Sequence, residues 1–166
     1  DRFLALFVGR DVPKKGLDHF LAAADESYGL VAVTDRVAEG DDRARFLPFM
    51  RHADLQRLLA AVDAFVLPSV GEGFPVVIQE ALALGVPVVT TPGPGYDRYL
   101  SPEEAVFVDA GGEAIRTELR RLEADPELRA RLAERGRLAA EREFDVDRFV
   151  AAYEALYERV RTVAAK

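Results

Sequence analysis

The sequence predicts an α/β fold: a three-layer sandwich with a mostly parallel sheet between two layers of helices, followed by a helical C-terminal tail. Short apolar runs alternate with segments whose apolar residues recur at helical spacing. The loops between them are short, so each helix can connect one strand to a parallel neighbour. From Glu113 onward only helical spacing remains. Alternation of this kind is typical of a Rossmann-like domain, which binds ligands at the carboxyl ends of its strands.

The predicted strands are apolar throughout rather than alternating, as expected for strands buried on both faces. In chain order they are Phe3–Val8, Leu30–Val33, Phe46–Phe49, Ala64–Leu67, Val86–Thr90 and Val106–Val108.

The predicted helices lie between these strands and after the last one. They run from Leu17 to Ala24, from Leu55 to Val62, from Val76 to Leu84, from Ile115 to Leu122, and onward from Asp125-Pro126. The last helix has a strong apolar stripe, formed by Phe149, Val150, Tyr153, Leu156, Tyr157 and Val160. This stripe is expected to pack on the sheet or on a neighbouring domain.

Composition limits the function classes. The chain has 166 residues, a net charge of −7, two histidines and no cysteine. The length suits one core. The negative charge argues against a binder of nucleic-acid backbones, and the lack of cysteine excludes disulfides and thiolate metal sites. Because no apolar run is long enough to span a membrane and no signal peptide begins the chain, a cytoplasmic domain is expected.

The first candidate site is the loop Gly9–Gly16, directly after the first predicted strand. Its cations Arg10, Lys14 and Lys15 precede a predicted helix, whose free N–H groups and partial positive charge favour a phosphate. The loop lacks the Gly-Lys-Ser/Thr ending of a Walker loop. A phosphate site and a solvated basic turn both fit these residues.

The second candidate site follows the fourth predicted strand and opens a helix. Pro75 suits the first helical position, and Val76 and Val77 are expected to present free N–H groups. Glu72 in the loop and Glu80 on the helix can accept hydrogen bonds from sugar or ribose hydroxyls, worth about 1.5–3 kcal/mol each. The alternative is a surface loop with an exposed helical glutamate.

Four blocks occur in a characteristic order along the chain. They are Gly9–Gly16, Leu59–Ser69, Glu72–Phe74 with Glu80-Ala81, and Gly85–Val89. Together they resemble the group 1 family of retaining glycosyltransferases, whose two Rossmann-like domains face each other across a cleft. The chain resembles the carboxy-terminal, donor-binding domain. The resemblance implies that residues 1–166 form a single nucleotide-sugar-binding domain, and that the acceptor-binding domain is absent from this chain.

The resemblance also assigns roles to residues. Arg10 and Lys15 are expected to hold the donor diphosphate and stabilise it as it leaves, and Glu72 to contact the transferred sugar, which makes these three the catalytic candidates. Glu80 is expected to bind the ribose hydroxyls. Further donor contacts implied are Gly9, the backbone of Gly73, Phe74 and Pro75, the helix start at Val76 and Val77, and the base loop Phe49, Met50 and Arg51.

The family is metal-independent, so no metal and no cofactor are expected beyond the nucleotide-diphosphate sugar, whose base stays open. Asp145-x-Asp147 matches the metal motif of other glycosyltransferases, but Asp145 is better explained as the N-cap of the last helix. The expected partners are the nucleotide sugar and an N-terminal acceptor domain, in a longer protein or a partner chain. Membrane association through that domain is left open. The isolated domain is expected to transfer almost nothing.

Some residues depart from the family pattern. The stretch Thr34–Arg45 is too short for the usual helix, and Val33-Thr34-Asp35 stands where a glycine-rich turn is common. The loop Thr90–Asp97 replaces a paired-glycine and glutamate pattern. These departures bear on base and sugar preference. Arg36, Asp41 and Asp42 are expected in a solvated loop, and His52 as a surface histidine rather than a base contact.

Two other functions fit the fold. One is a glycogen-synthase-like or phosphorylase-like relative, which donor choice separates from the leading hypothesis. The other is a non-catalytic nucleotide-binding or regulatory module that keeps the fold. The presence of Arg10, Lys15, Glu72 and Glu80 favours the transferase over that module.

Overall fold

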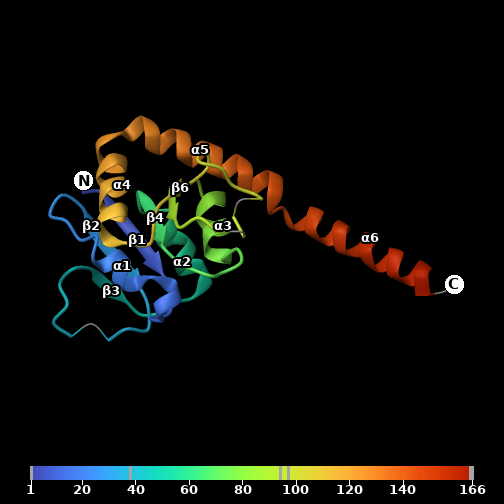
Figure 1. The fold of residues 1–166 in the computed structure, drawn as a ribbon, viewed down its shortest axis with the longest axis horizontal. Helices are drawn as coiled ribbons and strands as arrows, with labels where there is room; N and C mark the ends of the chain where they lie inside the picture. Colours follow the sequence, from blue (N-terminus) through green and yellow to red (C-terminus); the bar gives the residue numbers. More distant parts are fainter. Residues whose placement is uncertain (1, 38, 94, 97, 165–166) are drawn as a thin grey trace.

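A parallel sheet forms the centre of the chain (Figure 1). The computed structural model describes residues 2–37, 39–93, 95, 96 and 98–164. Pro94 and Asp97 belong to the loop Thr90–Asp97, which differs from the family pattern, and they lie outside the described residues. The strands are β1 (Leu4–Val8), β2 (Gly29–Val33), β3 (Arg45–Leu47), β4 (Ala64–Leu67), β5 (Val88–Thr90) and β6 (Val106–Phe107), in the spatial order β3-β2-β1-β4-β5-β6. Every pairing recorded between them is parallel.

All of the predicted strands are present, and their apolar runs are explained by burial on both faces. Ala5–Phe7 of β1 and the whole of β4 have no solvent exposure. Two predicted boundaries are wrong by two residues, while the others agree within one residue, and proline is the reason in both. β3 ends at Leu47 before Pro48, and β5 begins at Val88 after Pro87, because proline has no N–H to donate to the sheet.

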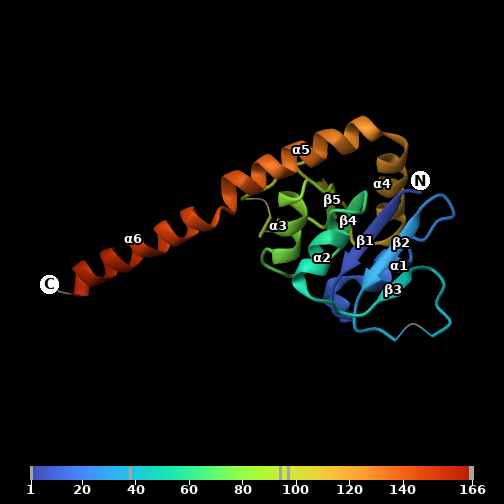
Figure 2. The same ribbon diagram turned by 180° about the vertical axis from the view of Figure 1, so that it is seen from behind.

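Helices cover both faces of the sheet (Figure 2). They are the 3-10 turn η1 (Pro13–Lys15), α1 (Leu17–Leu21), α2 (His52–Leu59), α3 (Val76–Ala83), α4 (Gly112–Ala124), α5 (Pro126–Glu143) and α6 (Val146–Ala164). α1 packs on α4, and α3 packs on α5. Right-handed crossovers place α1 on one face and α2 and α3 on the other. The predicted three-layer, Rossmann-like architecture is confirmed.

Two details of the helices differ from the predictions. α1 ends at Leu21 rather than Ala24, closing with short-range bonds such as Ala24 N to the Leu21 carbonyl at 3.2 Å. Pro75 is the extended residue before α3, with φ −58° and ψ 132°, rather than the first helical residue. Its carbonyl oxygen accepts the first bond of α3 from Ile78 N at 3.1 Å.

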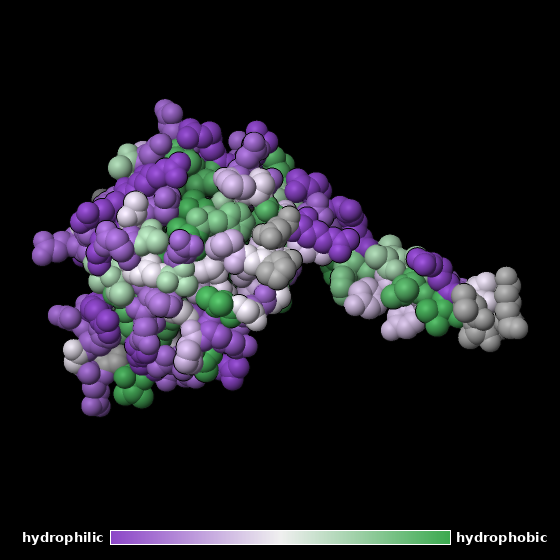
Figure 3. All heavy atoms as spheres, viewed as in Figure 1, coloured by the Kyte–Doolittle hydropathy of each residue, from purple (hydrophilic) through white to green (hydrophobic). Residues whose placement is uncertain are grey.

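The C-terminal helices begin at capping aspartates. Asp125 accepts from Leu128 N at 2.8 Å and Asp145 accepts from Arg148 N at 2.9 Å, so the N-cap interpretation of Asp145 is confirmed. α6 extends away from the sheet with its apolar stripe exposed (Figures 1 and 3). Phe149, Tyr153 and Tyr157 are 59%, 49% and 70% exposed. Among the described residues the stripe does not pack on the sheet, and its packing on a neighbouring domain stays a prediction.

The strand order places one crevice at the centre of the sheet. Connections leave β1 toward β2 on one side, and leave β4 toward β5 on the other. The direction of winding therefore reverses between the adjacent strands β1 and β4. Loops at such a reversal diverge and leave room for a ligand at the carboxyl ends of the strands.

Candidate functional site

The two predicted loops meet at this crevice. Lys15 Nζ, after β1, lies 2.7 Å from Glu72 Oε2, after β4, and Lys14 Nζ lies 3.4 Å from Glu72 Oε1. The side chains of Lys15 and Glu72 are only 19% and 11% exposed. The backbones are also joined, because Val70 N donates to the Lys14 carbonyl at 2.8 Å. Residues far apart in the sequence thus form one charged cluster.

Local structure aims Lys15 into the crevice. Lys15 N donates to the Val12 carbonyl and Gly16 N to the Pro13 carbonyl, which winds the loop into η1. Gly16 then takes φ +75° and lies against Pro68, where a Cβ atom would be 2.4 Å from the Pro68 carbonyl oxygen. Only glycine combines this left-handed conformation with so close a contact. The loop is thereby held against the end of β4.

A hollow of about 420 Å³ opens at the start of α3. Its lining residues are Lys14, Lys15, Gly71, Glu72, Gly73, Phe74, Pro75, Val76 and Val77. Val76 and Val77 begin α3, so their N–H groups have no acceptor within the helix. Lysine side chains facing such a helix start suit an anion.

The first loop leads into a helix at Leu17, as the sequence suggested, but that helix is short. α1 has only five residues, which is too short to carry an appreciable dipole. The anion-binding contribution of this loop therefore rests on its cations. Arg10 is exposed, and among the described residues it is not part of the lining of the hollow.

Aromatic packing anchors the loop between Glu72 and α3. The ring of Phe74 lies 5.3 Å from that of Tyr96, 5.8 Å from Tyr99 and 4.9 Å from Phe144, measured between centroids. Pairs of this kind contribute about 0.5–1.5 kcal/mol beyond burial. This packing holds Phe74 in place between Gly73 and Pro75, which line the hollow together with it.

Glu80 meets a residue that the sequence did not pair with it. Glu80 Oε1 on α3 lies 2.6 Å from His52 Nε2, at the start of α2. His52 is 63% exposed, so the surface prediction is confirmed, but its contact with Glu80 was missed. Twenty-eight residues separate the two, and only the packing of α2 beside α3 brings them together.

The predicted base loop is separate from the Lys15–Glu72 hollow. Phe49 is 52% exposed and lines a second hollow of about 420 Å³ with Thr34–Val37. Met50 packs against the hydrophobic core. The 85% exposed side chain of Arg51 donates from Nε to Asp54 at 2.9 Å. Of this loop, Phe49 is therefore the side chain placed at a hollow.

Two general features bear on the range of functions. Among the residues that the structure describes, no three His, Cys, Asp or Glu side chains gather as a metal site would require. Across the same ranges, no helix combines the length and apolar character needed to cross a membrane.

Two solved structures with this fold are each about twice as long as the chain. Sucrose-phosphate synthase from Thermosynechococcus elongatus superposes with a TM-score of 0.88 at 25% identity, covering 98% of this chain and 46% of that one. Anabaena HepE, solved in complex with UDP-glucose, superposes with a TM-score of 0.81 at 21% identity, covering 98% and 49%. The likeness to HepE shows the fold alone.

Relatives in sequence are glycosyltransferases. The lipopolysaccharide core biosynthesis glycosyltransferase LpsE of Rhizobium meliloti (strain 1021) is 41% identical over 85 residues, which cover 50% of this chain and 25% of LpsE. The putative teichuronic acid biosynthesis glycosyltransferase TuaC of Bacillus subtilis (strain 168) is 37% identical over 97 residues, covering 55% and 25%. The aligned part thus spans about a quarter of each relative.

The family model described as glycosyl transferases group 1 matches residues 37–139. The match covers well over half of the 166 residues and includes the loop of Glu72, all of α3 and most of α5, which packs against α3. Sequence, fold and the position of the charged crevice agree, and the chain belongs to the group 1 glycosyltransferase family.

Proposed function

We propose that the chain is the donor-binding domain of a retaining glycosyltransferase, which transfers a sugar from a nucleotide-diphosphate sugar without a metal ion. The observation that carries the proposal is the Lys15–Glu72 pair, 2.7 Å apart, beside the free N–H groups of α3. Cations and a helix start bind a diphosphate, and a carboxylate beside them accepts hydroxyl groups of a sugar. The hollow thus offers complementary groups to adjoining parts of one donor.

In the proposed reaction the bond between the sugar and the diphosphate breaks, and negative charge develops on the leaving nucleoside diphosphate. Lys15, which lines the hollow, stabilises that charge, and Arg10 of the same loop is assigned to it from the resemblance to the group 1 family. Because these cations and the N–H groups of Val76 and Val77 supply the positive potential, the proposed transfer does not require a divalent ion. Retention of configuration is proposed from the resemblance to the group 1 family.

Lys15 and Glu72 change partners in this proposal. In the structure they neutralise each other while almost buried. A bound donor provides a diphosphate for Lys15 and hydroxyl donors for Glu72, so neither charge is left unpaired. Glu80 is assigned to the ribose hydroxyls, and Phe49 with the backbone of Met50 and Arg51 to the base.

An acceptor-binding domain completes the proposed enzyme. The sequence relatives and the fold neighbours extend well beyond the aligned part. The exposed stripe of α6, with Tyr157 70% exposed, is a surface suited to a second domain. The neighbour HepE was solved with UDP-glucose, which supports a donor of the nucleoside diphosphate sugar class.

Calorimetric titration with UDP, GDP and ADP, with and without Mg²⁺, tests the proposal. One nucleoside diphosphate is expected to bind saturably and independently of Mg²⁺. Lys15→Ala is expected to weaken it by about tenfold or more, since a charge-assisted hydrogen bond contributes about 1.5–3 kcal/mol. Arg57→Ala, which removes an exposed ion pair with Asp54 on α2, is the control. Failure of all three nucleotides to bind contradicts the proposal.

A further inference from the structure

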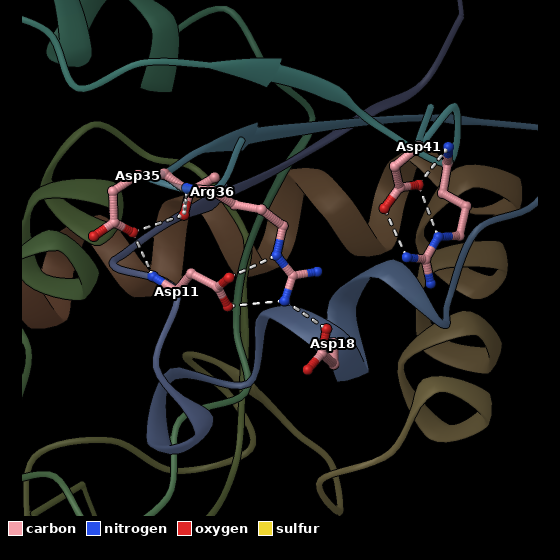
Figure 4. A network of polar contacts seen from close by, with 7 residues as sticks. Asp11, Asp18, Asp35, Arg36 and Asp41 are labelled. Carbon is pink, nitrogen blue, oxygen red and sulfur yellow. Dashed lines mark hydrogen bonds and ion pairs between the residues drawn. The ribbon is translucent and has the colours of Figure 1, made fainter. Parts of the chain in front are cut away.

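A network of ion pairs connects the loop Gly9–Gly16 to the loop between β2 and β3 (Figure 4). Arg36 donates from Nε to Asp11 Oδ2 at 2.7 Å and from Nη2 to Asp11 Oδ1 at 2.8 Å. Nη2 also donates to Asp18 Oδ1 on α1 at 2.7 Å. The double contact with Asp11 fixes the direction of that carboxylate as well as its distance.

The backbone of Asp11 is held from the same side. Asp11 N donates to Asp35 Oδ1 at 2.6 Å. Asp35 thus holds the main chain of Asp11, and the next residue, Arg36, holds its side chain. The register of the sheet explains the proximity, because Val8 pairs with Val33 and both loops leave the sheet side by side. The Asp11 N–H, with a smaller contribution from the charge of Arg10, lowers the pKa of the Asp35 carboxyl group.

The network occupies positions where the chain departs from the family pattern. Thr34 and Asp35 stand where a glycine-rich turn is common, and the described residues between β2 and β3 form turns rather than a helix. Arg36 lies in a solvated loop, as predicted, in which Asp42 is exposed, but its own side chain is 21% exposed and forms ion pairs that the sequence did not reveal. The ion pairs thus link the loop Gly9–Gly16 to a connection between β2 and β3 whose described residues contain no helix.

We propose that Arg36 is a positioning residue, which holds Asp11 and thereby keeps the loop Gly9–Gly16, with its cations Arg10 and Lys15, in the conformation that binds the diphosphate. The proposal rests on the proposed function and deepens it. Nε and Nη2 of Arg36 are both engaged by the carboxylates of Asp11 and Asp18, which favours an action through Asp11 over a direct contact with the donor. A partly exposed ion pair adds little to global stability, so the effect falls on the conformation of the loop. Small errors in the placement of a charged group weaken its action strongly.

A double-mutant cycle separates positioning from direct contact. Arg36→Ala and Asp11→Ala are each expected to weaken binding of the nucleoside diphosphate about tenfold, and the double variant is expected to bind no more weakly than the weaker single one. Removing the negative charge of Asp11 would by itself strengthen the binding of an anionic nucleotide. Weaker binding by Asp11→Ala would therefore show that the loss of positioning outweighs this electrostatic gain. Arg43→Ala is the matched control, since it removes another two-point pair, with Asp41, from the same loop.

Amide hydrogen exchange of residues 9–16 provides a readout that needs no nucleotide. Arg36→Ala is expected to accelerate exchange in this segment and Arg43→Ala to leave it unchanged. The inference is overturned if Arg36→Ala changes neither exchange nor affinity. It is also overturned if Asp11→Ala leaves affinity unchanged or raises it while Arg36→Ala lowers it, because Arg36 then binds phosphate directly. If the unmodified chain binds no nucleoside diphosphate, the proposed function fails and the positioning role with it.

Discussion

Gly16→Ala is expected to destabilise the chain by displacing the first loop from the end of β4. A methyl group at this position would lie 2.4 Å from the Pro68 carbonyl oxygen and 2.8 Å from Pro68 Cγ, at φ +75°. The left-handed conformation costs an L-residue about 1–2 kcal/mol, and overlap in a packed site costs about 1–3 kcal/mol. The free energy of unfolding should therefore fall by about 2–5 kcal/mol.

Urea unfolding of matched variants measures this cost. Gly40 has φ +77°, and no heavy atom of the described residues lies within 4 Å of a Cβ built there. Gly40→Ala should therefore show the conformational cost alone, and its difference from Gly16→Ala isolates the contact with Pro68. Nucleotide affinity should fall with Gly16→Ala, since Lys15 is the preceding residue. A loss of stability no greater than that of Gly40→Ala would refute the proposed docking of the loop.

Three further predictions concern single side chains. His52→Ala should weaken ribonucleotide binding about two- to tenfold, because it releases Glu80. His52→Gln should restore part of the affinity, and neither variant should change the affinity for 2′,3′-dideoxynucleotides. An equal loss of affinity for dideoxynucleotides would show that His52 does not act through Glu80. Asp125→Ala should lower the free energy of unfolding by about 1 kcal/mol through loss of the α5 cap, and an unchanged urea midpoint would contradict this. The pKa of Asp35 is lowered from 3.8, so its stabilising contribution is complete above that value and is lost as the pH falls through the lower folded pKa. In Asp35→Asn the free energy of unfolding should therefore fall less steeply with decreasing pH below 3.8 than in the unmodified chain. An equally steep fall would contradict the contact between Asp35 and the Asp11 N–H.

The architecture was predictable because the apolar runs have one physical explanation. Strands such as Ala64–Leu67 are buried on both faces, and parallel strands gather their following loops at one edge of the sheet. The proximity of Lys15 and Glu72 follows from that topology, even though 57 residues separate them. Sheet boundaries were less predictable where Pro48 and Pro87 shorten the strands.

The contacts that the sequence did not reveal depend on tertiary placement. His52 reaches Glu80 only because α2 lies beside α3. Arg36 stands in a polar loop of ordinary composition, and its partner Asp11 is 25 residues away. Neither pair has periodicity or spacing that marks it. Arg10, by contrast, belongs to a recognisable motif, and its role at the diphosphate stays a prediction.

A crystal structure of the chain with the nucleoside diphosphate that binds best tests the central claim most directly. The diphosphate is expected between η1 and the start of α3, with Lys15 Nζ moved from Glu72 to a phosphate oxygen and the N–H groups of Val76 and Val77 directed at it. Nucleotide bound elsewhere, for example in the hollow at the amino ends of the strands that Arg2 and Tyr28 line, with the Lys15–Glu72 pair intact, would contradict the account.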